Sequence, residues 1–250
     1  MIASSDCHYC CQPLTPAFFD MSQNRKKNQT QAVIILAYTV VILVFLEYFG
    51  RPEFFYSQFP ALSREQSGLY PLLWWAAWTI VLFLLLPAMI IKTVFKQRLV
   101  DFGFKLKIRR QYYALYLGMF LAVLPLVIYA STREDFRAIY PFFRGAIHSP
   151  VSSIIVWEAA YLSTFVALEF FFRGFLVLGL EKNFGRLAVW VAVIPYAMLH
   201  FHKPPLEAFG AIIAGLVLGE VAQRTRSILG GVFVHVGVAA SMDFLALNRF

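Results

Sequence analysis

Long apolar stretches, separated by short segments that carry the charges, constrain this chain more than any other feature. Five of them cover about residues 31–49, 70–91, 112–130, 151–172 and 228–247. A helix of about 20 apolar residues spans the ~30 Å hydrocarbon core of a bilayer. Two shorter stretches, about 187–201 and 207–222, are interrupted by polar residues and complete a set of seven. The pattern predicts an all-α, polytopic membrane bundle of about seven helices.

The composition agrees with a membrane protein and excludes a nucleic-acid-binding one. The chain is 60% hydrophobic and 14% charged, whereas a soluble domain carries roughly 25% charged residues. Its net charge of +8 is divided among short clusters between apolar stretches. No basic and aromatic surface outside the bilayer is large enough to hold a nucleic-acid strand. We therefore expect the lipid bilayer as a partner, and no nucleic acid.

The distribution of Lys and Arg predicts the orientation in the membrane. If the N-terminus lies inside, the inner segments hold 14 basic residues and the outer segments hold 7, with Arg173 inside a span. Basic residues concentrate on the cytoplasmic side of membrane proteins. We expect a cytoplasmic N-terminus, an external C-terminus and, as the location, the inner membrane of a bacterial cell.

The region before the first apolar stretch has no apolar periodicity. We expect residues 1–30 to be a disordered cytoplasmic segment, followed by three transmembrane helices over residues 31–130. Cys7, Cys10 and Cys11 beside His8 could bind a metal. A single cluster of this kind, without a second pair, is more typical of an unstructured leader.

Ionisable residues within apolar segments gather in the C-terminal part of the chain. Such groups cost several kcal/mol each in hydrocarbon and usually mark function. In the first three spans only Glu47 is present, near a helix end. The last hundred residues contain Glu158, Glu169, Arg173, His200, Glu220, His235 and Asp243. The sequence therefore places the chemistry in this C-terminal region.

Three of these residues can meet at one depth in the membrane. The segment Asn183–Arg186 is typical of a tight turn between antiparallel helices, and its centre is equidistant from Glu169 and His200. At 1.5 Å per residue, the two side chains then lie at the same depth. His235 reaches a similar depth on its own helix if the helices are tilted. We predict one site formed by Glu169, His200 and His235.

Helical spacing adds three further candidates. Glu169 and Arg173 are four residues apart, which predicts an ion pair on one helix face; Arg173 either only neutralises the carboxylate or takes part in catalysis. Glu158 lies on the same face as Glu169, three turns away, and Asp243 lies on the same face as His235. Glu158 could equally be structural, hydrogen-bonded to a neighbouring helix.

Three segments in this region resemble the motifs of a known family. Leu168–Gly174 reads LEFFFRG, Tyr196–His200 reads YAMLH and His235–Ala239 reads HVGVA. They resemble the ordered Glu-Glu-xxx-Arg, Phe-xxx-His and His-xxx-Asn/Asp motifs of the CPBP family, the group of CAAX prenyl endopeptidases and bacteriocin-processing (Abi) proteins. The resemblance covers about residues 150–247 and implies a catalytic helix core there.

Two positions depart from the family pattern. Leu168 stands in place of the first Glu, which in the family is taken to activate water, and Ala239 stands in place of the final Asn or Asp. Three residues could substitute: Asp243, one turn beyond Ala239; Glu169 itself as the base; or Glu158, if it reaches in. The sequence leaves this choice open.

The resemblance implies an intramembrane endopeptidase that cleaves a membrane-associated peptide, with prenylated and signal-bearing peptides as candidate substrates. Arg173 would keep Glu169 ionised so that it takes a proton from water. His200 and His235 would either donate hydrogen bonds to the tetrahedral oxyanion or bind Zn²⁺ together with Glu169. Metal and metal-free chemistry both remain open at this point.

Two other functions compete with hydrolysis. A catalytically degenerate member would keep the fold as a membrane scaffold or partner-binding protein. Buried carboxylates and histidines also form relays in solute or proton transporters, although this sequence has no paired repeat halves. Cleavage of a peptide by the purified protein separates the first alternative from an enzyme.

Overall fold

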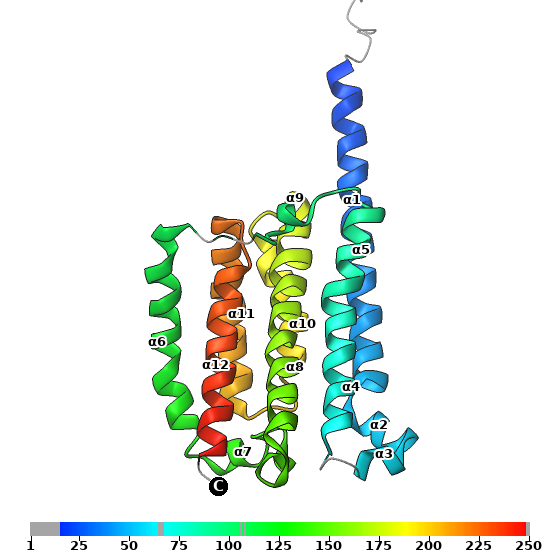
Figure 1. The fold of residues 1–250 in the computed structure, drawn as a ribbon. Coiled ribbons are helices and arrows are strands. Elements are labelled where there is room, and N and C mark those ends of the chain that lie inside the picture. The colour runs from blue at the N-terminus through cyan, green and yellow to red at the C-terminus, as the bar shows by residue number, and fades with distance from the viewer. Residues whose placement is uncertain (1–15, 65–67, 106, 108, 249–250) are drawn as a thin grey trace, which may run out of the picture.

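A computed structural model describes residues 16–64, 68–105, 107 and 109–248, and within these ranges every regular element is a helix (Figure 1). Cys7, His8, Cys10 and Cys11 lie outside the described residues. Short 3₁₀ turns and three π-helical segments interrupt or extend the α-helices. The α-helices are α1 (Pro16–Phe45), α2 (Pro52–Gln58), α3 (Pro60–Arg64), α4 (Leu69–Ile80), α5 (Leu86–Thr93), α6 (Tyr113–Ala130), α7 (Glu134–Arg137), α8 (Val151–Glu169), α9 (Gly179–Phe184), α10 (Leu187–Met198), α11 (Pro205–Thr225) and α12 (Leu229–Leu247).

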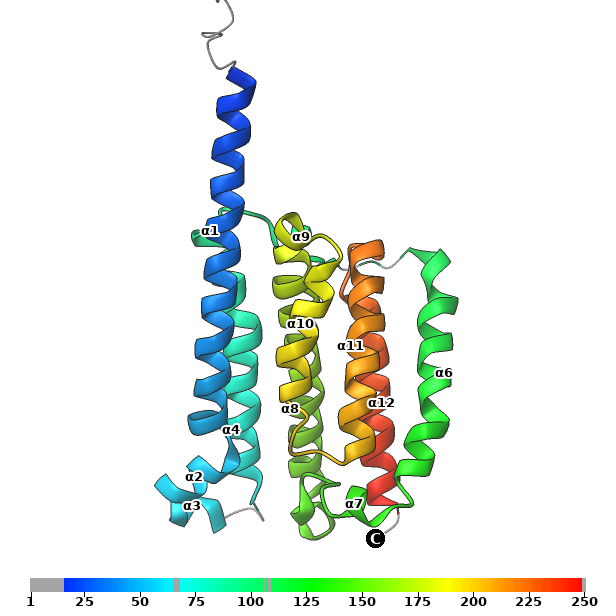
Figure 2. The ribbon, with the colours of Figure 1, turned by 180° about the vertical axis from the view of Figure 1, so that it is seen from behind.

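Six helical segments are long and apolar enough to cross a membrane, so the predicted polytopic bundle of about seven helices is confirmed. The seventh apolar helix is α10, which has only 12 residues. At 1.5 Å per residue it covers about 18 Å, and Figure 2 shows it ending short of the level that α8 reaches. The six segments are Gln23–Gly50, Leu69–Thr93, Arg110–Ala130, Val151–Phe184, Pro205–Thr225 and Leu229–Leu247.

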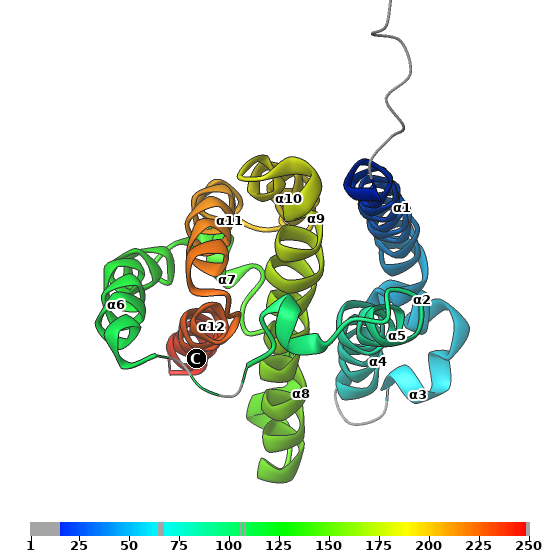
Figure 3. The same ribbon diagram turned by 90° about the horizontal axis from the view of Figure 1, so that it is seen from above.

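The helices form three groups across the bundle. Seen from above, α1 lies beside α4 and α5 at one side, and α6 lies at the opposite side beyond α12 (Figure 3). Between them, α8 to α12 form the central group that carries the candidate residues. The core between α1, α4, α5 and the central group is rich in buried aromatic rings, among them Phe83, Phe171 and Phe175. Phe83 and Phe171 stack with ring centroids 4.7 Å apart.

The first helix is longer than the sequence analysis predicted. It begins at Pro16 and projects from the bundle (Figure 1), so residues 16–30 are helical where we expected disorder. No Gly or Pro occurs between residues 17 and 49. Because each added residue of a growing helix contributes one hydrogen bond, the helix continues beyond its apolar part. Residues 1–15 lie outside the described ranges.

The predicted hairpin between the apolar stretches at about 151–172 and 187–201 is present. The helical segment Val151–Phe184 runs without interruption to a turn at Gly185, whose φ of 55° is left-handed. Glycine adopts this conformation without the steric cost that a Cβ would impose. The chain then reverses into α10, which packs against α9 and α11.

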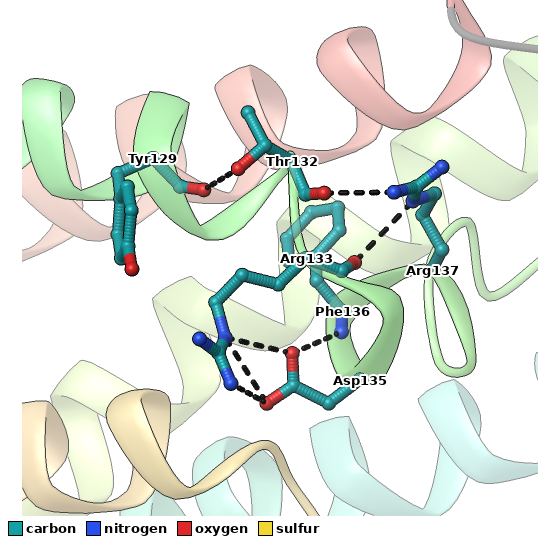
Figure 4. Close-up of polar contacts among 6 residues, drawn as sticks. All are labelled: Tyr129, Thr132, Arg133, Asp135, Phe136 and Arg137. Atoms are coloured by element: carbon teal, nitrogen blue, oxygen red, sulfur yellow. Dashed lines mark hydrogen bonds and ion pairs between the residues drawn. The ribbon is translucent and has the colours of Figure 1, made fainter.

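The corner between α6 and α7 is held by local polar contacts (Figure 4). Arg133 Nε donates to Asp135 Oδ1 at 3.1 Å, and this hydrogen bond holds the pKa of the Asp135 carboxyl below its usual range. Arg137 Nη2 donates to the carbonyl of Thr132 at 2.7 Å. The corner presents Phe136, which is buried together with Ala246 of α12. The loop is thereby attached to the end of the last helix.

The loops that flank α6 lie at opposite ends of the bundle (Figure 1), and this arrangement makes the predicted orientation testable. With the native cysteines replaced, Lys96→Cys should be protected from a membrane-impermeant thiol reagent added to intact cells, while Ile147→Cys should react. The reason is the excess of basic residues in the loop that contains Lys96. Labelling of both positions from outside would contradict the topology.

Candidate active site

Glu169 is the centre of a buried polar group. Its side chain is completely buried at the end of α8. Oε1 accepts a hydrogen bond from His235 Nδ1 at 2.8 Å and lies 3.3 Å from Nη1 of Arg173. The predicted ion pair between Glu169 and Arg173 is thus confirmed. His235 is the second partner of the same oxygen.

A π-helical segment, Phe170–Leu178, directly follows Glu169 and is buried over its whole length. Such segments are rare and are often found at functional sites. Gly174 lets this segment pack closely on the loop before α6, because an added Cβ would lie 2.6 Å from the carbonyl oxygen of Phe102. The Phe-Phe-Phe-Arg-Gly sequence therefore anchors the helix that carries Glu169 and Arg173 in the core.

Gly231 on α12 makes room for the Glu169 carboxylate. A Cβ added at Gly231 would lie 2.1 Å from Glu169 Oε2, so any side chain here would displace the carboxylate. Gly231 is one helical turn before His235, and the same stretch of α12 therefore provides both the space and the hydrogen bond. Oε2 has no hydrogen-bond partner within the described part of the chain.

Tyr196 on α10 is a site residue that the sequence analysis did not select. Because His235 Nδ1–H donates to a carboxylate, Nε2 carries the lone pair and accepts a hydrogen bond from the Tyr196 hydroxyl at 3.2 Å. The Tyr196 ring also faces the Arg173 guanidinium, 4.4 Å from the ring centroid. The sequence alone could have pointed to Tyr196, because the family motif has Phe at this position and the Tyr of this chain adds a hydroxyl group.

His200 joins the group through Tyr196. It lies in the turn after α10 and is partly buried. Its Nδ1–H donates to the carbonyl of Tyr196 at 2.9 Å, and the two rings are 4.9 Å apart at their centroids. In the neutral form its Nε2 is therefore an acceptor. The contacts form a chain that runs from Glu169 to His235, then to Tyr196 and then to His200. His200 is therefore connected to Glu169 only through Tyr196 and His235.

Glu158 and Asp243 belong to a separate group of polar residues. Their carboxyl groups are neighbours between α8 and α12, without a hydrogen bond of ordinary geometry. Glu158 is eleven residues from Glu169, about 16 Å along the helix, and Asp243 is about 12 Å from His235. Asp243 is 2% exposed, so it faces neither solvent nor His235 but the α8 side chains. Neither acid substitutes for the missing motif residues by reaching the Glu169 group.

Lys203 anchors the turn that carries His200. Its Nζ donates to the hydroxyl of Tyr140 at 2.7 Å, and Tyr140 donates to Glu207 Oε1 at 2.9 Å. The ammonium also lies 4.0 Å from the Phe142 ring centroid. Burial lowers the pKa of Lys203, while the Glu207 carboxylate opposes this shift. These contacts attach the turn to the loop between α7 and α8.

The predicted Zn²⁺ ligands, Glu169, His200 and His235, do not form a metal site in the described ranges. No group of three or more His, Cys, Asp or Glu side chains there is arranged to hold an ion. The Glu169 carboxylate is already engaged, with Oε1 between Arg173 and His235 and Oε2 against Gly231. These residues do not fit a three-ligand zinc site.

Comparison with known proteins identifies the region that carries this group. The family model of the type II CAAX prenyl endopeptidase Rce1-like proteins matches residues 150–241, which run from the start of α8 into α12. Neither a curated protein nor a solved structure matches the chain. Glu169, Arg173, Tyr196, His200 and His235 all lie within the matched residues. Through this segment, which is 92 of the 250 residues, the chain is similar to the CAAX-type membrane proteases of the CPBP family.

Proposed function

We propose that the protein is an intramembrane endopeptidase that hydrolyses a peptide bond of a membrane-associated substrate. The observation that carries this proposal is the 2.8 Å hydrogen bond between the buried Glu169 carboxylate and His235. A carboxylate that orients an imidazole and stabilises its protonated form is a recurring element of hydrolytic sites. The family match supports a protease of the CAAX type, and the charge distribution supports a cytoplasmic N-terminus. The proposed location is the inner membrane of a bacterial cell.

In the proposed mechanism His235 is the proton acceptor. Glu169 holds Nδ1–H, so Nε2 is free to take a proton from a water molecule that replaces the Tyr196 hydroxyl there. The resulting hydroxide attacks the substrate carbonyl carbon, and the carbonyl π electrons move to the oxygen. When the C–N bond breaks, His235 returns the proton to the leaving amine. The Nε2 lone pair of His200 is a second acceptor that can orient the water.

Tyr196 supplies the hydrogen-bond donor for the oxyanion in this mechanism. Neutral His200 presents only an acceptor at Nε2, and the proton that His235 has gained there is the one it returns to the leaving amine, whereas the phenol O–H can donate to the oxyanion throughout. Arg173 stays paired with Glu169 and acts as a positioning residue. This assignment differs from both sequence-based alternatives, in which the two histidines either donate to the oxyanion or bind Zn²⁺.

Tyr196→Phe should lower kcat by about 10²-fold, the typical effect of removing one oxyanion donor. The ring that faces Arg173 is retained, so KM and thermal stability should change little. Steady-state cleavage of a peptide by protein in lipid nanodiscs measures both parameters. An unchanged kcat would show that the hydroxyl is only a partner of His235 in the resting state.

The decisive test of the proposal is cleavage itself. Purified protein in lipid nanodiscs is incubated with a prenylated CAAX peptide or a signal-bearing membrane peptide, and mass spectrometry identifies the products. We expect a single cleavage that persists in EDTA and disappears in His235→Ala. Absence of cleavage with both substrate classes would favour the catalytically degenerate scaffold, and loss of cleavage in EDTA would contradict the metal-free mechanism.

A further inference from the structure

A polar cavity of about 410 Å³ lies at the end of the bundle where α1 projects, remote from Glu169. It is formed by α1 and the turn between α9 and α10. All six side chains around it are polar, two are cationic and none is acidic. They are Asn24, Arg25, Asn28, Gln29, Lys182 and Asn183.

One face of α1 is directed to this cavity. Residues 24, 25, 28 and 29 fall within about 140° of the helix circumference, because successive residues are turned by about 100°. Lys26 and Lys27 fall on the opposite side and do not contribute to the lining. Of the three adjacent cations on α1, Arg25 therefore faces the cavity, whereas Lys26 and Lys27 face away from it.

The cations of the cavity lack the acidic partners that neighbouring arginines have. Arg186 and Arg224 contact Glu220 Oε1 at 2.8 and 2.9 Å, and Arg226 is paired with Glu181. Within the described part of the chain, Arg25 and Lys182 make no ion pair. Two positive charges that make no ion pair with a described residue thus face the same cavity, and four carboxamide groups add N–H donors.

The cavity lies at the ends of two candidate membrane spans, where lipid headgroups are expected. Two candidate membrane spans, Gln23–Gly50 and Val151–Phe184, have their ends at its walls. Just below it, Gln31 Nε2 donates to the Gly179 carbonyl at 2.9 Å and ties α1 to α9. The residues that follow Gln31 on α1 are mainly apolar and enter the bundle core.

We propose that this cavity binds a phosphate group, either of an anionic phospholipid headgroup or of a soluble phosphate at the membrane surface. A phosphate offers only acceptor oxygens and negative charge, which match two cations and four carboxamides. The Arg25 guanidinium can bind two phosphate oxygens at once, and Lys182 adds a point charge. The site does not depend on the proposed peptidase activity.

Thermal unfolding of the full-length protein in mixed micelles tests this site, because a ligand bound to the native state raises the unfolding midpoint. The probes are dioleoylphosphatidylglycerol, dioleoylphosphatidylcholine and inorganic phosphate. We expect the midpoint to rise with phosphatidylglycerol but not with phosphatidylcholine. A surface cation contributes roughly fivefold to the binding of anionic lipid. Arg25→Gln/Lys182→Gln should therefore raise the half-saturating amount of phosphatidylglycerol by tenfold or more.

The matched control is Lys26→Gln/Lys27→Gln, which removes the same charge from the opposite face of α1 and should change the half-saturating amount less than threefold. Arg25→Lys/Lys182→Arg should retain most of the response. Each variant is compared with its own midpoint in phosphatidylcholine, which excludes a general loss of stability.

An equal response to inorganic phosphate would assign the site to a soluble phosphate. Equal losses in the two double variants, or no response in the wild type, would overturn the proposal.

Discussion

Glu169→Gln should reduce cleavage by about 10³-fold or more and should also destabilise the protein. The glutamine removes the charge that stabilises protonated His235, and its NH₂ group can hold the imidazole in the wrong tautomer. Arg173 is 2% exposed, and among the described residues its one ion pair is with Glu169. Leaving a buried charge unpaired costs about 3–5 kcal/mol. Cleavage kinetics and thermal unfolding in the same nanodiscs measure the two effects.

A second variant separates the chemical effect from the structural one. Arg173→Met in the Glu169→Gln background removes the unpaired cation and keeps an unbranched side chain of similar length. The double variant should recover most of the lost stability without recovering cleavage. Recovery of both would show that Glu169 acts only as the partner of Arg173, and the role of Glu169 in orienting His235 and stabilising its protonated form would be wrong.

Gly231→Ala should abolish most of the activity through a single methyl group. The new Cβ would lie 2.1 Å from Glu169 Oε2, so the carboxylate has to move and its hydrogen bond to His235 is lost or lengthened. A displacement of about 1 Å at a reacting group can cost 10²-fold in rate. Overpacking of this kind costs about 1–3 kcal/mol in stability. Cleavage rate and the unfolding midpoint report the two quantities.

Gly210→Ala is the matched control for this substitution. It places the same methyl group on a helix, but at Gly210 no heavy atom lies within 4 Å of the added Cβ. Alanine is also favoured over glycine inside helices by roughly 0.5–1 kcal/mol. The control should keep its activity and stability. If Gly231→Ala behaved in the same way, the carboxylate would not depend on the space beside α12.

Some features of this protein were predictable from its sequence because they depend only on residue spacing within one segment of the chain. Apolar length predicted a membrane bundle of about seven helices, confirmed by six long apolar helices and α10. The four-residue spacing predicted the Glu169–Arg173 ion pair, which has a distance of 3.3 Å. The turn around Gly185 was predictable because turn residues interrupt the apolar pattern there. The family motifs directed attention to the same residues.

Only the tertiary structure decided which side chains share a site, because those contacts join helices that are distant in the sequence. Glu169 and His235 are 66 residues apart, and Tyr196 and His235 are 39 residues apart. No periodicity along one helix predicts that Tyr196 reaches His235. Equally, spacing on α12 suggested that Asp243 could reach the site, but the packing of α12 on α8 brings it to Glu158. A helix sets which residues share a face, and its neighbours decide what that face contacts.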